Sequence, residues 1–350
     1  MSLTIEFKEY AQKHGIDLIG VTSAEAFEVD RLDEPIMNPR TYQENAKSVV
    51  VWGFYAGSPP MEPSKPGALL GRLVPELKAV PAMHEYCYGI IERYLNEKGY
   101  DAVRLDGAKM ALKPLAVKAG LGLYGKNSLV HAEGFGSWIT LGCVVTDSPL
   151  EVEERPYKLS DCGDCTLCME ACPTKAIKEP YKVMPSLCIT SWLDGVPVAR
   201  ELREKVENRL TGCDICRKAC PKNQGLALRR HYPFEIEEKS DSPELIPLLS
   251  GDESYYKTVL PSFALWLADI STLRRNAALA LGNIRDPAAV PALVEALGYS
   301  EPQVRSYAAW ALGRIGGKKA REALARAHSN EVNLEVQEEI KAALQECSKA

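Results

Sequence analysis

Eight of the eleven cysteines of the 350-residue chain gather between residues 162 and 220. Gaps of two, two and three residues, with a proline at the end, separate the first four, which are Cys162, Cys165, Cys168 and Cys172. The second run, also followed by proline, comprises Cys213, Cys216 and Cys220, with Cys188 upstream. In bacterial ferredoxins, three cysteines of such a run bind one 4Fe-4S cluster and the fourth binds the other. The spacing therefore predicts two 4Fe-4S clusters.

The ferredoxin pattern also assigns each cysteine to a cluster, because the last cysteine of a run crosses to the other cluster. One predicted ligand set, called set A, is Cys162, Cys165, Cys168 and Cys220. The other, called set B, is Cys172, Cys188, Cys213 and Cys216. Zinc and disulfides are the alternatives. Zinc favours two separate pairs of cysteines, and a reducing compartment disfavours disulfides.

Composition is that of a globular protein, with 46% hydrophobic and 25% charged residues and a net charge of -5. Charged residues interrupt the N-terminal 15 residues, so no signal peptide is expected, and no apolar run reaches the length of a membrane span. We therefore expect a cytoplasmic protein with no membrane contact. The length predicts more than one domain, and the mild acidity argues against a protein coated in nucleic acid.

Before the cysteines, the pattern predicts a mixed α/β domain. Short apolar or β-branched runs at 17–22, 48–55 and 138–146 predict strands. Residues 76–98 predict a helix with one buried face, on which we expect Cys87 to pack in the core. The whole chain is predicted to be an α+β multidomain protein. Its expected parts are an α/β domain at 1–150, a ferredoxin-like domain with two clusters at 151–232, a helical connector at 233–270 and helical repeats at 271–350.

The C-terminal part contains an internal repeat with a period of 31 residues. Leu273, Ala277, Leu281, Gly282 and Ile284 correspond to Val304, Ala308, Leu312, Gly313 and Ile315. This pattern resembles short HEAT-like repeats, whose stacked helix pairs form a surface for macromolecules. A helical cap that only stabilises its neighbour is the alternative.

Residues 120–125, GLGLYG, fit the dinucleotide-binding motif G-x-G-x-x-G. That motif requires a strand before the glycines and a helix after them. Here a helical stretch, 115–118, precedes the glycines, and the residues after them do not resemble the start of a helix. Nicotinamide binding is therefore rejected.

The order of these motifs resembles the epoxyqueuosine reductase family. The resemblance rests on Leu105-Asp106, residues 119–127, Gly136-Ser137-Trp138, the two cysteine runs and Cys220-Pro221-Lys222-Asn223. Enzymes of this family resemble cobalamin-dependent reductive dehalogenases and remove an epoxide oxygen from a modified base of tRNA. The resemblance implies a corrinoid-binding catalytic domain at 1–150, two 4Fe-4S clusters, and HEAT-like repeats that help to hold tRNA.

The resemblance also implies roles for individual residues. Asp106 occupies the position of the family's catalytic aspartate, which would give a proton to the departing oxygen. The implied cofactor contacts are Gly122, Tyr124, Lys126, Asn127, Ser137 and Trp138. The implied partners are tRNA and a low-potential electron donor such as ferredoxin or flavodoxin, and a monomer is expected. Candidate residues for tRNA contact are Arg229, Arg230, Arg274, Arg275, Arg305, Arg314, Lys318, Lys319 and Arg321.

Four positions depart from the family pattern. Leu112, next to Lys113, replaces a usual acidic residue, Cys143 replaces a usual glutamate, and Leu123 replaces tryptophan or serine. Cys143 itself is expected to be a buried thiol on a strand. These departures motivate a second hypothesis, a related corrinoid enzyme that acts on a small molecule. A non-catalytic electron carrier with a helical scaffold is the third.

Overall fold

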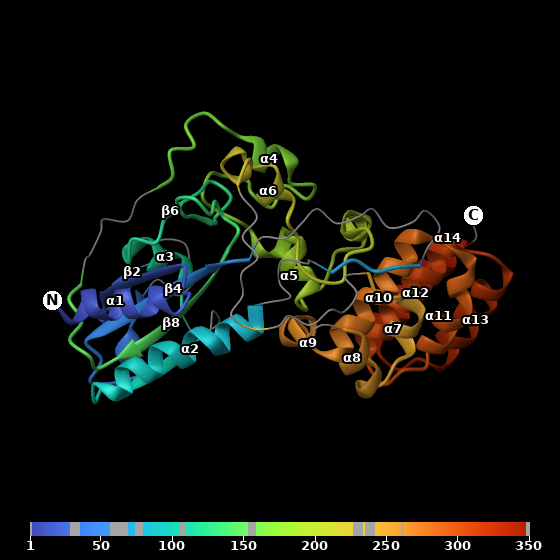
Figure 1. Ribbon diagram of the computed structural model, residues 1–350. Coiled ribbons are helices and arrows are strands. Elements are labelled where there is room, and N and C mark those ends of the chain that lie inside the picture. The colour runs from blue at the N-terminus through green and yellow to red at the C-terminus, as the bar shows by residue number, and fades with distance from the viewer. Residues whose placement is uncertain are drawn as a thin grey trace. The chain divides into compact units, whose positions relative to one another are not determined.

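The computed structural model describes residues 2–28, 36–56, 69–73, 80–105, 110–152, 159–226, 234, 242–260 and 262–347 (Figure 1). The chain divides into two compact units. Unit 1 consists of Met1–Pro59, Ala79–Met184 and Ile215–Ile236, and unit 2 of Pro60–Lys78, Pro185–Asp214 and Glu237–Ala350. The cysteine-rich segment thus contributes residues to both units. No helix within the described ranges is long and apolar enough to cross a membrane.

Unit 1 is built on a four-stranded antiparallel sheet with the order β1-β4-β8-β5. The strands are β1 (Leu18–Ser23), β4 (Ser48–Tyr55), β8 (Ile139–Thr146) and β5 (Ala102–Leu105). Strand β4 is central, and all eight of its residues are buried. A strand that is covered on both faces lacks the alternation of polar and apolar residues. The strands predicted around 17–22, 48–55 and 138–146 are confirmed.

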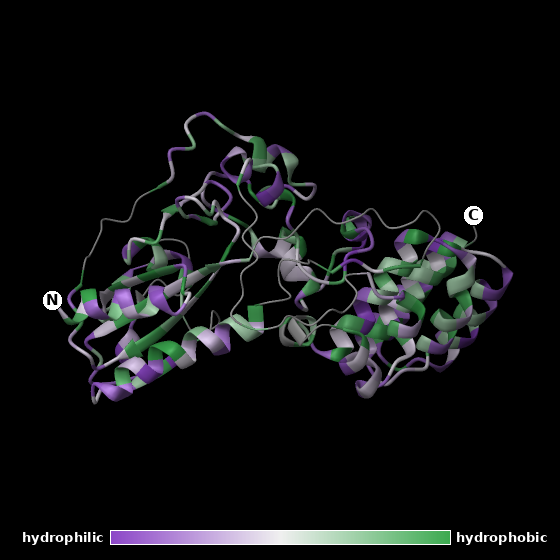
Figure 2. Ribbon diagram, in the orientation of Figure 1, coloured by the Kyte–Doolittle hydropathy of each residue, from purple (hydrophilic) through white to green (hydrophobic). Residues whose placement is uncertain are grey.

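Helices cover both faces of this sheet. On one face Trp52 packs edge-on against Tyr88 of α2 (Val80–Glu97), and Tyr94 of the same helix contacts Phe7 of α1 (Leu3–Lys13). The opposite face packs against α3 (Leu112–Lys118). Figure 2 shows hydrophobic and hydrophilic residues alternating along α2, as the sequence predicts.

Two predictions about buried cysteines in unit 1 are confirmed. Cys87 lies on the buried face of α2, where burial raises the pKa of its thiol to about 12. Cys143 on β8 belongs to the core on the α3 side of the sheet. Both thiols are therefore packing residues.

The other elements of unit 1 are short. They are β2 (Phe27–Glu28), β3 (Ile36–Met37), η1 (Pro39–Thr41), β6 (Leu123–Tyr124), β7 (Val130–His131), α4 (Leu167–Ala171), α6 (Ile215–Lys218) and η5 (Pro221–Asn223). Helices α4 and α6, which follow cysteines of the two runs, lie side by side (Figure 1).

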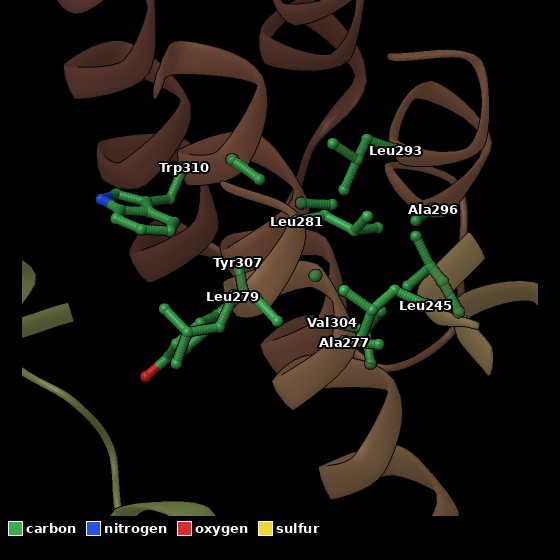
Figure 3. Packing of buried hydrophobic residues seen from close by; sticks show 14 of the residues in the cluster. Leu245, Ala277, Leu279, Leu281, Leu293, Ala296, Val304, Tyr307 and Trp310 are labelled. Atoms are coloured by element: carbon green, nitrogen blue, oxygen red, sulfur yellow. The ribbon is translucent and has the colours of Figure 1, made fainter. Parts of the chain in front are cut away.

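Unit 2 is helical. Its elements are η3 (Pro185–Leu187), α5 (Ile189–Leu193), η4 (Arg200–Val206), α7 (Leu245–Ser250), α8 (Glu253–Val259), α9 (Ser262–Leu267), α10 (Ile270–Ile284), η6 (Pro287–Ala289), α11 (Val290–Ala296), α12 (Pro302–Ile315), α13 (Lys318–Asn330) and α14 (Leu334–Cys347). The helix pairs α10–α11 and α12–α13, followed by α14, correspond to the predicted repeat. Figure 3 shows side chains of α7, α10 and α11, among them Leu245, Leu281 and Leu293, meeting in the core.

Two glycines that lie 31 residues apart make equivalent close contacts between helices of the repeat. A Cβ atom on Gly282 of α10 would lie 2.8 Å from the Cα atom of Ala311 in α12. A Cβ atom on Gly313 of α12 would lie 2.8 Å from the Cα atom of Ala343 in α14. Each glycine therefore allows its helix to approach the backbone of the next repeat.

We predict that Gly313→Ala lowers the free energy of unfolding by about 1–3 kcal/mol, because backbone must move to admit the methyl group. Gly89→Ala is the matched control, since Gly89 lies within α2 and a Cβ atom there meets nothing within 4 Å. That control is expected to be neutral or to stabilise by up to about 1 kcal/mol. Urea unfolding followed by circular dichroism measures both, and equal stability of the two variants would contradict the packing argument.

Candidate iron–sulfur site

The first cysteine run forms a turn followed by a short helix. The Cys165 amide donates to the Cys162 carbonyl at 3.0 Å, and Gly163 between them has a φ of +48°, which glycine tolerates. Cys168 lies within α4, and Cys172 directly follows it. The second run brings Cys220 to the start of η5.

The four thiols of set A come together in unit 1. Burial, and then charge repulsion from the sulfurs of Cys220, Cys162 and Cys165, raises the pKa of Cys168. Burial and the sulfurs of Cys162 and Cys165 also raise the pKa of Cys220. Thiolates that lie close together repel one another, and a metal centre between them offsets this repulsion because it is positively charged. Binding of the metal therefore releases the thiol protons. The donor set therefore fits a cluster, although its role as the ligand set stays a prediction.

A 4Fe-4S cluster has four iron atoms, and each thiolate binds a different one, so the four sulfur ligands need not converge on one point. Within the described residues, no three His, Cys, Asp or Glu side chains could hold a single metal ion. All eleven cysteines lie in described ranges, and none of them forms a disulfide. The arrangement is thus compatible with a cluster.

Set B is divided between the units and also stays a prediction. Cys172 and Cys216 belong to unit 1, whereas Cys188 and Cys213 belong to unit 2. Burial raises the pKa of Cys172, but hydrogen bonds from Thr174 and from nearby backbone amides outweigh this effect and lower it. Cys188 precedes α5, and Cys213 packs against the core of unit 2.

The hairpin β6–β7 carries four of the six predicted cofactor contacts. Gly122 approaches the backbone of the facing strand, because a Cβ atom there would lie 2.5 Å from the carbonyl oxygen of His131. Tyr124 is buried at the end of β6. Lys126 donates from Nζ to the carbonyl oxygen of Cys165 at 3.1 Å and to that of Gly163. The hairpin therefore contacts the first cysteine run directly.

Asn127 and His131 form a buried polar pair within this hairpin. Oδ1 of Asn127 lies 3.2 Å from Nε2 of His131, and the two residues are 3% and 8% exposed. Burial, and then the positive charges of Lys222 and Arg217, lowers the pKa of His131 to about 4, so the imidazole is neutral at pH 7. Gly125 provides the space for this ring, because a Cβ atom there would lie 2.4 Å from Nε2. Gly122 and Gly125 of the G-x-G-x-x-G pattern thus serve packing within the hairpin.

The turn at 136–138 holds the second cysteine run. The Ser137 amide donates to Oδ1 of Asn223 at 2.7 Å, and Nδ2 of Asn223 donates to Oγ of Ser137 at 2.8 Å and to the Arg217 carbonyl at 2.7 Å. Gly136 has a φ of +56°, and a Cβ atom there would lie 2.2 Å from Oδ1 of Asn223. The guanidinium of Arg217 lies 5.1 Å from the centre of the Trp138 ring. The sequence had assigned no role to Asn223, although it follows the Cys220-Pro221 signature.

The corrinoid role that the resemblance implied for the six residues stays a prediction. Lys126 and Ser137 use their polar groups on the cysteine-bearing segments, and Trp138 stacks on one of them. Gly122 and Asn127 are taken up by packing within the hairpin.

Asp106 lies outside the described residues, but the strand that leads to it is described. Leu105 ends β5 opposite Cys143 of β8, and its carbonyl accepts a hydrogen bond from the Tyr88 hydroxyl at 2.9 Å. Leu112 and Lys113 begin α3, where Leu112 is half-buried and Lys113 is exposed. Leu123 is half-buried on β6.

Most of the arginines predicted to contact tRNA are engaged within unit 2. Arg275 is 1% exposed and donates to Oδ1 of Asn276 and the Trp192 carbonyl, so it cannot reach a phosphate. Arg274, Arg305 and Arg314 pair with Glu301, Glu331 and Glu204. Arg229 and Arg230 lie outside the described residues. Exposed candidates on α13 are Lys318, Lys319 and Arg321.

We predict that Asn223→Ala lowers the iron content of the purified protein, because it removes three hydrogen bonds that hold the second cysteine run. The neighbouring Gln224→Ala is the control, since Gln224 has no hydrogen bond through its side chain among the interactions of the described residues. Iron and acid-labile sulfide analysis measures the loss. An unchanged iron content in Asn223→Ala would contradict the docking role.

Comparisons with known proteins agree with this organisation. Residues 161–223 match the family model of a 4Fe-4S double cluster binding domain, and residues 268–345 match that of HEAT repeats. The two clusters and the HEAT repeats expected from the sequence are thereby confirmed.

Full-length relatives identify the family. Epoxyqueuosine reductase of Listeria monocytogenes is 31% identical over 370 residues, covering 97% of each chain. The Bacillus subtilis enzyme is 29% identical over 363 residues, covering 96% of this chain and 93% of its own. A solved structure of epoxyqueuosine reductase with an epoxyqueuosine-modified tRNA stem loop superimposes with a TM-score of 0.84 at 26% identity and 99% coverage of both chains. The chain belongs to the epoxyqueuosine reductase family.

Proposed function

We propose that this oxidoreductase converts epoxyqueuosine in tRNA to queuosine. The observation that carries the proposal is the match to family members along 97% of the chain. The gathering of set A in unit 1 and the double-cluster match support the redox part. The solved complex of a family member with a modified tRNA stem loop supports the choice of substrate.

The proposed reaction needs two electrons and two protons for each epoxide. The two carbon–oxygen bonds break, a carbon–carbon double bond forms, and the oxygen leaves as water. Iron–sulfur clusters transfer single electrons, so two successive transfers complete one turnover. A low-potential donor such as ferredoxin or flavodoxin would supply them to a monomeric, cytoplasmic enzyme.

Asp106 is the proposed proton donor. It directly follows β5, whose last residue is fixed by its pairing with β8 and by the Tyr88 hydroxyl. A carboxylic acid on such an anchored strand end can be positioned within reach of a departing oxygen. The chain's own contribution here is to hold and transfer this proton.

Cobalamin dependence is also proposed, on the family resemblance alone. Cobalamin would supply a strongly reducing cobalt for the chemistry at the epoxide. Its proposed contacts are the six residues that the resemblance implies, of which Lys126, Ser137 and Trp138 also contact the cysteine-bearing segments.

One departure from the family pattern no longer favours a different substrate. Cys143 is 0% exposed within the core of unit 1. A side chain without exposed surface cannot select a substrate by contact. The departure at Cys143 therefore no longer supports the hypothesis of a small-molecule substrate.

We predict that the anaerobically reconstituted protein, supplied with cobalamin and a low-potential reductant, converts epoxyqueuosine in a tRNA stem loop to queuosine. Asp106→Asn should lower turnover at least about 100-fold, because a general acid typically contributes that much. Nucleoside mass spectrometry measures the product, and the iron content verifies that both clusters remain. Full activity of Asp106→Asn would remove this residue from the mechanism, and no conversion by the wild type would refute the proposed function.

We also predict that Lys318, Lys319 and Arg321 bind tRNA phosphates. Replacing all three with alanine should weaken binding and reduce the slope of log affinity against log salt by about 2–3, because each phosphate contact contributes somewhat less than one. Lys257→Ala with Lys341→Ala is the control, since both are exposed lysines that lie outside α13. An unchanged slope in the triple variant would place the tRNA surface elsewhere.

A further inference from the structure

Lys126 places an ammonium group against the peptide that joins the first two predicted cluster ligands. Its Nζ atom lies 2.5 Å from the Gly163 carbonyl oxygen and 3.1 Å from that of Cys165. In a trans peptide the N–H points opposite to the C=O. The two carbonyls belong to the same peptides as the amide N–H groups of Asp164 and Thr166, so Lys126 also fixes the direction of these amides. They point away from Lys126, and amides in such a loop can donate to cluster sulfur.

The backbone that carries Lys126 is itself held to the cysteine-bearing segment on both sides of the first run. Before the run, the Ser160 amide donates to the Tyr124 carbonyl at 2.7 Å. After it, the Tyr181 amide donates to the Lys126 carbonyl at 2.9 Å, and the Ser128 hydroxyl donates to the Tyr181 carbonyl at 2.8 Å. The hairpin and the cysteine turn thus form one hydrogen-bonded assembly within unit 1.

Among the described residues, no carboxylate pairs with Lys126. No ion pair found in the described parts of the chain includes Lys126, whereas Lys222, which lies near the same thiols, pairs with Asp161. Lys126 is also partly buried, which reduces screening by solvent. The positive charge of Lys126 therefore acts on the cluster that the neighbouring cysteines are predicted to bind.

A 4Fe-4S cluster with four thiolate ligands is an anion, and reduction adds one more negative charge. A fixed positive charge nearby stabilises the reduced form more than the oxidised form. Net charge and hydrogen bonds to the sulfurs are main determinants of cluster potential. Lys126 can influence both the net charge around the cluster and the hydrogen bonds to its sulfurs.

We propose that Lys126 is a positioning residue for the cluster of set A, which holds the Cys162–Cys165 turn and raises the reduction potential of that cluster. The proposal rests on the proposed ligand set. It gives Lys126 a role in electron transfer that the resemblance did not imply.

A redox titration of the whole protein, reconstituted anaerobically and followed by electron paramagnetic resonance, tests this role. The variants are Lys126→Met, which removes the charge and the donors, and Lys126→Arg, which keeps both. Lys178→Met is the matched control, because Lys178 is an exposed lysine of the same segment. Iron and sulfide analysis accompanies each titration.

In Lys126→Met we expect one of the two clusters to become about tenfold harder to reduce, a fall of about 59 mV in its midpoint potential. Lys126→Arg and Lys178→Met should match the wild type. Unchanged potentials in Lys126→Met at full iron content would overturn the proposal, as would an equal shift in Lys126→Arg. If Lys126→Met instead loses one cluster, retention of that cluster by Lys126→Arg supports the positioning role, and its loss in both variants overturns it. A wild type that binds no iron would refute the ligand set itself.

Discussion

The cysteine-bearing segments of unit 1 depend on polar contacts with two turns of the α/β fold. Burial and the neighbouring sulfurs raise the pKa of the Cys168 and Cys220 thiols, so the fold alone does not favour thiolates at this place. Lys126 on the β6–β7 hairpin holds the first cysteine turn, and Asn223 joins the second run to the turn at Ser137. These contacts assemble ligands that lie more than fifty residues apart in the sequence, and the metal centre would then supply the cation that the thiols require.

A second constraint shapes unit 2, where close packing and buried charge stabilise the helical repeats. Gly282 and Gly313 let successive helices approach backbone to backbone. Arg275 donates to the carbonyl of Trp192, which lies outside the repeats, and so links them to the preceding helix α5. Several arginines that resemble an RNA-binding set therefore stabilise the fold, and the exposed cations of α13 remain for a polyanionic partner.

The sequence predicted the features whose signals are local or periodic. The strands at β4 and β8, helix α2 and the repeat of 31 residues follow from runs of apolar residues and their spacing. The cysteine spacing predicted the double-cluster domain, which the family match confirms. Contacts between residues far apart in the chain leave no local or periodic pattern in the sequence. The pairing of Asn223 with Ser137, the reach of Lys126 to the cysteine turn and the burial of Arg275 depend on tertiary structure, so the sequence did not predict them. The position of Asp106 was inferred from family resemblance and is not tested by the described residues.

The most direct test of the central claim is the iron content of Cys162→Ala, Cys220→Ala and the double variant. If both cysteines bind the same cluster, each single variant falls from about eight to about four irons per chain, and the double variant also keeps about four. A double variant with almost no iron would mean that Cys162 and Cys220 serve different clusters, and the assembly described for unit 1 would be wrong.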